Sequence, residues 1–155
     1  MAHSMVGNLL VMAGLALAAP SPVAADSGSL HLVRRIHVGT LTDYPERSAL
    51  VQAALEMELR TAGFEVVDDR AAPDAVLSAT ATVTITVDGD ERTNPRDAYS
   101  FLLTLAPTGK LVWTTKVYIS NGQAVQGESR EVGTVAVRRL AAAWKKSARK
   151  AAHGR

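Results

Sequence analysis

Residues 75 to 87, "AVLSATATVTITV", alternate between apolar and polar side chains more regularly than any other segment of this chain. A hydroxyl group occurs at every second position from Ser78 to Thr86. Because successive side chains of a β-strand point to opposite faces, this period of two predicts one long strand with a dry face and a wet face. The fold must therefore contain a sheet that is covered on one side only.

Four further segments have the composition of strands. Apolar and polar residues alternate in 30–41 and 98–106, while 64–69 and 111–120 are rich in Val, Ile, Phe and Trp. The tetrapeptide "PTGK" separates two of these segments, and Gly109 within it suits the positive φ angle of a tight turn. In 30–41, Arg34 interrupts the side that is otherwise apolar.

Two segments are predicted to be helices. The first follows Thr42 and Asp43, has Pro45 in its first turn and ends at Gly63. Its expected buried stripe consists of Leu50, Val51, Ala54, Leu55, Leu59 and Ala62. The second covers about 131–152, with Ser129 as its expected N-cap. Its expected buried side consists of Gly133, Ala136, Val137, Leu140, Ala141, Trp144, Ala148 and Ala151.

The order of these segments is β-α-β-β-β-β-α. The first β-α-β unit is expected to be parallel and right-handed, and the last three strands, joined by turns, should form an antiparallel meander. The predicted fold class is therefore α+β: a two-layer sandwich, with a mixed sheet and both helices on one face.

The first 25 residues are interpreted as a signal peptide. An apolar run at 9–19 is too short to cross a bilayer, which takes about 20 residues, and small residues at 23–25 suit cleavage after Ala25. No Lys or Arg precedes the apolar run, which is unusual for such a leader. Residues 26–155 would then form one domain. The chain contains no cysteine, which excludes disulfides, a thiol nucleophile and a lipid-modified cysteine. We expect a periplasmic or secreted protein without a transmembrane anchor.

The row of hydroxyl groups has three interpretations. The first is the water-facing side of the sheet, since Thr suits a pleated and solvated surface. The second is a flat threonine array of the ice-binding type. That array needs the same motif on neighbouring strands, which the sequence lacks. The third is a face or edge that receives a strand from another protein.

Charge is distributed unevenly along the chain. From Arg138 to the end there are seven basic residues and no acidic ones, whereas residues 26–137 hold ten basic and fifteen acidic residues. Six of the seven basic residues fall on the predicted outer face of the last helix: Arg138, Arg139, Lys145, Lys146, Arg149 and Lys150. Such a face suits a solvated helix end that matches the helix dipole, a protein or envelope partner, or nucleic acid. The one aromatic residue nearby, Trp144, lies on the apolar stripe, so nucleic acid is not expected.

No combination of residues predicts catalysis or metal binding. His31 and His37 would lie about 20 Å apart on the polar side of one strand, and His153 lies in the C-terminal tail. Adjacent carboxylates at Asp68 and Asp69 would point to opposite faces of a strand, and acid–base pairs must converge. Residues 88–99 lack the Gly and Glu of a calcium loop. We therefore expect no enzyme and no cofactor.

Several short motifs resemble a broad group of exported bacterial domains. They are the Leu-x-x-x-Gly-Phe helix end at 59–64, the "VVD" strand at 66–68, the entry to the long strand at 74–77, and "GKLVW" at 109–113. The group includes domains of the curli secretion lipoprotein, the Tol translocation protein and lipoprotein activators of penicillin-binding proteins. The resemblance covers roughly residues 36 to 146 and implies non-enzymatic work on envelope proteins. Many members are lipoproteins, and this chain departs from them in having no cysteine.

The sequence thus predicts an exported, non-enzymatic accessory domain that acts by protein–protein contact in envelope assembly or regulation. Its partner-binding residues would be the six cationic residues of the last helix, and its partner an envelope protein whose identity stays open. The alternative is a module that binds a small ligand or lipid in a groove between helix and sheet. The oligomeric state stays open as well.

Overall fold

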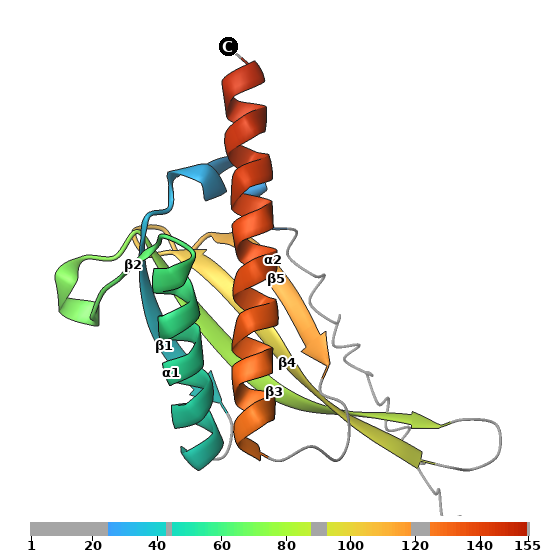
Figure 1. The fold of residues 1–155 in the computed structure, drawn as a ribbon. Helices are drawn as coiled ribbons and strands as arrows, with labels where there is room; N and C mark the ends of the chain where they lie inside the picture. Colours follow the sequence, from blue (N-terminus) through green and yellow to red (C-terminus); the bar gives the residue numbers. More distant parts are fainter. Residues whose placement is uncertain (1–24, 43–44, 88–92, 119–124, 155) are drawn as a thin grey trace, which may run out of the picture.

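A computed structural model describes residues 25–42, 45–87, 93–118 and 125–154. Their elements form one mixed sheet with two helices on a single face (Figure 1). The strands are β1 (Arg35–Thr42), β2 (Glu65–Val66), β3 (Ala75–Val87), β4 (Thr93–Leu105) and β5 (Leu111–Tyr118). The helices are α1 (Pro45–Thr61) and α2 (Val125–His153), with short 3-10 helices η1 (Ser27–Leu32) and η2 (Asp69–Ala71).

The topology confirms the predicted fold class. The sheet order is β2-β1-β3-β4-β5; β1 is parallel to both β2 and β3, whereas β3, β4 and β5 form an antiparallel meander. Helix α1 ends before Gly63, whose φ of 92° is the left-handed conformation that glycine adopts readily.

The alternation in β3 has the predicted consequence over its described side chains. Ala75, Leu77 and Ala79 are buried under the helices, Ser78 is partly exposed, and Thr80 is exposed. The side chains from Thr82 to Thr86 lie outside the described residues. The described part of the hydroxyl row is therefore the solvent-facing side of the sheet.

The core lies between that sheet and the two helices. Buried residues of α1 include Val51, Ala54, Leu55 and Leu59, as predicted, whereas Leu50 and Ala62 are exposed. The prediction was wrong at these two positions, and Ala62 lies beyond the last helical residue, Thr61. In the meander, the buried side chains include Tyr99, Phe101, Leu103, Trp113 and Val117.

Val112 is fully buried although it is adjacent to Trp113, which simple alternation forbids. The register between β4 and β5 shifts here, because Leu103 pairs with Trp113 and the next residue, Thr104, pairs with Leu111. This irregularity places two consecutive side chains inside the core.

Three predicted boundaries were wrong. The strand predicted at 30–41 begins only at Arg35; before it, Asp26 accepts the Gly28 N–H at 2.9 Å and initiates η1, which buries Leu30. The strand predicted at 64–69 is only Glu65–Val66, because Asp68 accepts the Arg70 N–H and initiates η2. The strand predicted at 98–106 begins earlier, because residues 93–97 also belong to β4.

Helix α2 begins at Val125 rather than near residue 131, so Ser129 lies within the helix and is not its cap. The later start was predicted because Gly127 and Ser129 are weak helix formers and Ser suits an N-cap. Intrinsic propensity is only a weak guide, and here it does not decide where the helix begins.

Candidate functional site

Helix α2 has one buried and one exposed side. Val132, Gly133, Ala136, Val137 and Leu140 are buried, at the spacing of a helix face that packs on the core. Helix α1 approaches α2 closely at Gly133: a Cβ atom there would lie 3.0 Å from the Ala54 Cβ and 3.2 Å from the Ala54 carbonyl carbon. The contact fixes which side of α2 faces outward.

All six cationic residues predicted as partner-binding are exposed on α2: Arg138, Arg139, Lys145, Lys146, Arg149 and Lys150. We call this set the basic face. Figure 1 shows that the C-terminal part of α2 extends past the sheet, with η1 beside it. The later residues of the basic face therefore lie on a projecting helix end rather than over the sheet.

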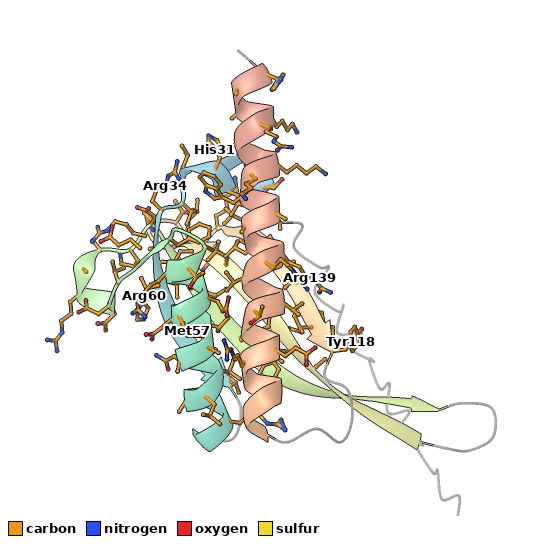
Figure 2. All side chains as sticks on the ribbon, viewed as in Figure 1. His31, Arg34, Met57, Arg60, Tyr118 and Arg139 are labelled. Atoms are coloured by element: carbon orange, nitrogen blue, oxygen red, sulfur yellow. The ribbon has the colours of Figure 1, made fainter. Side chains whose placement is uncertain are left out.

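Arg139 differs from the other five residues. Its guanidinium donates to the Lys116 carbonyl at 2.7 Å and to the Thr115 hydroxyl at 3.2 Å, and Figure 2 shows it extending from α2 toward β5. Arg139 thus donates a hydrogen bond to a backbone carbonyl of β5, which is an edge strand of the sheet. Within the described part of the chain, the other five residues of the basic face form no ion pair.

Trp144 anchors the projecting half of α2. Its indole N–H donates to the Val33 carbonyl at 3.0 Å, the Arg34 guanidinium lies 4.3 Å from its ring centroid, and Phe64 meets it edge-on at 6.3 Å. Arg34, which interrupts the apolar pattern of the sequence, therefore forms a cation–π contact with the helix.

Ser147 holds η1 against the same helix. Its hydroxyl donates to the Ser27 carbonyl at 2.8 Å and accepts the His31 N–H at 3.3 Å, while the His31 ring Nδ1 lies 3.4 Å away. His31 belongs to η1, so the prediction that it shares a strand with His37 was wrong. Because the Ser147 proton is engaged by a carbonyl, this serine and histidine are not arranged as a nucleophile and its base. Sequence reasoning missed Ser147; the signal was a lone hydroxyl on an alanine-rich stripe.

A cavity of about 500 Å³ opens beside Ser147, between α2 and η1. Its α2 side consists of Ala143, Ser147 and Ala151, with Lys146 and Lys150 alongside, and the first two residues of η1 form the opposite wall. A second hollow of about 360 Å³ lies along Arg130, Thr134 and Arg138 of α2. Neither of these two cavities is the groove between helix and sheet in which the alternative hypothesis placed a small ligand.

Asp26 ties the start of η1 to the turn between β4 and β5. Its carboxylate pairs with the Lys110 ammonium, and its backbone N–H donates to the Leu111 carbonyl at 3.0 Å. The hydrogen bond from Lys110, the Gly28 N–H and the positive charge of Lys110 hold the pKa of the Asp26 carboxyl below its ordinary value.

The side of the sheet that faces away from the helices carries hydroxyl groups together with two exposed large side chains, Leu102 and Tyr118. The Lys116 ammonium lies 5.3 Å from the Tyr118 ring centroid. This mixed surface offers no flat threonine array over the residues that the structure describes.

Among the described residues, no three His, Cys, Asp or Glu side chains are grouped so that they could hold a metal ion. None of the helices in these ranges combines the length and the apolar character needed to cross a bilayer.

No protein-family model matches the chain, and no curated protein matches it. Among solved structures, it is similar to a PelC dodecamer from Paraburkholderia phytofirmans (TM-score 0.48, 16% identity, 76% of this chain and 93% of that chain). It is also similar to lipoprotein GNA1162 from Neisseria meningitidis (TM-score 0.45, 15% identity, 70% of this chain and 98% of that chain). A third similar structure is a minor lipoprotein from Acinetobacter baumannii (TM-score 0.46, 12% identity, 71% of this chain and 92% of that chain). Bacterial lipoproteins are thus among the proteins that this chain resembles, as its sequence motifs predicted. At these identities the similarity concerns architecture and assigns no function.

Proposed function

We propose that this chain is an exported, non-enzymatic accessory domain that binds an acidic surface of another envelope protein through the basic face of α2. The observation that carries the proposal is the projecting end of that helix. Residues 138–155 contain no acidic residue, and five exposed cations of the basic face form no ion pair within the described residues.

A solvated helix end explains some of this charge, because cations near a helix C-terminus are favoured by about 0.3–1 kcal/mol each. That effect falls off within the last turn, whereas the basic face begins at Arg138, several turns before His153. A long cationic strip on a rigid helix instead provides electrostatic complementarity, which increases the association rate and fixes the orientation of an acidic partner. The hypothesis includes export through the predicted leader at 1–25, with release after Ala25.

Trp144 and Ser147 support the proposal because they hold the projecting helix in place. An interaction surface on a rigid element loses less conformational entropy on binding than one on a free tail. Arg139 is the exception within the basic face: its guanidinium is engaged with β5, so its contribution to partner binding should be the smallest.

Site-specific photo-crosslinking in the native host tests the proposal. A photoreactive amino acid replaces exposed Ala142, which lies among the cations of α2, and a matched probe replaces exposed Gln52 on α1. We expect a covalent adduct to one protein from Ala142 and none from Gln52. The adduct should disappear in Lys145→Glu/Arg149→Glu and weaken at high salt.

The matched control is Arg60→Glu/Arg70→Glu, which changes the net charge equally at two exposed positions away from α2. This pair should leave the adduct unchanged. Equal loss of the adduct in both pairs would show that net charge alone matters. An adduct that survives reversal of Lys145 and Arg149 would exclude the basic face as the interface.

A further inference from the structure

The cavity between η1 and the C-terminal half of α2 has the features of a binding site for a small ligand. Its volume of about 500 Å³ falls within the range of about 300–1,000 Å³ typical of ligand pockets. One of its walls, η1, is held against α2 by the two hydrogen bonds of Ser147.

The small side chains on α2 create the space. Ala143, Ser147 and Ala151 are spaced four residues apart, which places them in one row along the helix. Methyl groups at both ends of this row give the floor an apolar surface. Since the Ser147 hydroxyl is occupied by the chain itself, the floor offers a ligand mainly apolar contact.

The charge of the cavity is positive. Lys146 and Lys150 line it one helical turn apart, and none of the described residues that line it is acidic. The Asp26 carboxylate contacts this wall, where it already accepts the Gly28 N–H and pairs with Lys110. Two like charges one turn apart destabilise a helix slightly, and an anion between them would reverse that effect.

Two carbonyl groups near the end of α2 are bonded without the side chains of Lys146 and Lys150. The carbonyl of Arg149 is bonded to the His153 ring Nδ1 at 2.8 Å, and the carbonyl of Lys150 accepts the Gly154 N–H at 3.2 Å. The ammonium groups of Lys146 and Lys150 are free to contact a ligand that lies over Ala143 and Ala151.

We propose that this cavity binds a small anionic amphiphile: a carboxylate or phosphate group held by Lys146 and Lys150, with a short hydrocarbon part over Ala143 and Ala151. The proposal goes beyond the protein contact proposed for the basic face, because it assigns two of its six cations, Lys146 and Lys150, to the cavity that they line.

The test is a titration of the full chain, labelled with nitrogen-15, with monooctyl phosphate below its micelle concentration in 0.15 M salt. Amide shifts should be confined to the start of η1 and to α2 from about 143 to 151. Octyl glucoside, which has the same tail and no charge, should cause no such shifts, and inorganic phosphate should bind at least tenfold more weakly.

Two matched double variants decide whether the cavity or the surface charge is responsible. Lys146→Gln/Lys150→Gln should weaken monooctyl phosphate binding at least tenfold. Lys145→Gln/Arg149→Gln removes the same charge from neighbouring positions that do not line the cavity, and should weaken binding by less than about threefold because salt screens exposed charges. All four positions are exposed, so both variants should keep the wild-type melting temperature.

Three results would overturn the proposal. One is equal weakening by the two double variants, and another is an absence of amide shifts at Ser27 and Gly28. In the third, the wild-type protein binds phosphatidylglycerol vesicles but does not respond to monooctyl phosphate. That result would mean that Lys146 and Lys150 contact a membrane surface. None of these results depends on the crosslinking at Ala142, so the two proposals can fail separately.

Discussion

Replacing Gly133 by alanine should fail to stabilise α2, although the same change stabilises an ordinary helix. A Gly→Ala substitution inside an exposed helix gains about 1 kcal/mol in helix propensity. At Gly133, however, the new Cβ would lie 3.0 Å from the Ala54 Cβ, 3.2 Å from the Ala54 carbonyl carbon and 3.3 Å from the Leu55 nitrogen. Two of these neighbours are backbone atoms, so the helices must move apart to relieve the contact.

The expected magnitude follows from these opposing effects. Overpacking in a close-packed core costs about 1–3 kcal/mol. Set against the gain in helix propensity, the net change in the free energy of unfolding for Gly133→Ala lies between about zero and a loss of 2 kcal/mol. At roughly 4 °C per kcal/mol for a domain of this size, the melting temperature should fall by up to about 8 °C.

Chemical and thermal unfolding monitored by circular dichroism measure this change. The control is Ala142→Gly, at an exposed position of the same helix, where only propensity acts and a loss of about 1 kcal/mol is expected. A second control combines Gly133→Ala with Ala54→Gly. Removing the Ala54 methyl group should cost less in that background than in the wild type, with a coupling of at least about 0.5 kcal/mol.

If Gly133→Ala raised the melting temperature by the full propensity gain of about 4 °C, the close approach of α1 and α2 would not exist in solution. Additivity of the two substitutions would likewise show that Ala54 and Gly133 are not in contact. The orientation of the basic face would lose its structural support in both cases.

Two further predictions concern Asp74, which binds the backbone at the start of β1, and Asp26, which initiates η1. The Asp74 carboxylate accepts the backbone N–H groups of Arg34 and Arg35 at 2.8 Å each. In urea unfolding, Asp74→Ala should therefore lower the free energy of unfolding by about 1–2 kcal/mol, and Asp74→Asn, which keeps an acceptor, should lower it by less. Equal losses in the two variants would contradict this role of the carboxylate. The folded-state pKa of Asp26 lies below its unfolded value, so the ionised carboxylate stabilises the fold above about pH 4 and loses this effect as pH falls through the folded pKa. The difference in melting temperature between wild type and Asp26→Asn should therefore become smaller as pH falls from 6 to below 4, and a difference that does not change with pH would show that the Lys110 pair does not form in solution.

Structural features that follow from a repeating pattern of side chains could be predicted from the sequence. The period of two in residues 75–87 identified β3 and its buried side, because alternation across a strand depends only on local geometry. Helical spacing identified half of the predicted buried side of α2 (Gly133, Ala136, Val137 and Leu140) and the exposure of its six cations, whereas Ala141, Trp144, Ala148 and Ala151 are only partly buried. Val132 and Ser147, which are buried, were not predicted. The left-handed end of α1 at Gly63 followed from the chemistry of one residue.

Features that depend on distant partners were not predicted. His31 and Leu30 looked like strand residues, yet η1 forms there because Ser147, far along the chain, bonds to its backbone and Asp26 initiates it. Arg139 looked equivalent to its neighbours, and only the position of the β5 edge shows that its guanidinium is engaged.

The sequence by itself determined that this chain forms a sheet covered on one side and carries a charged helix, since both follow from the spacing of side chains along a local element. Only the tertiary structure decided that the end of this helix projects past the sheet beside a cavity. The position of η1 depends on hydrogen bonds between residues more than a hundred positions apart, and no local pattern records such contacts.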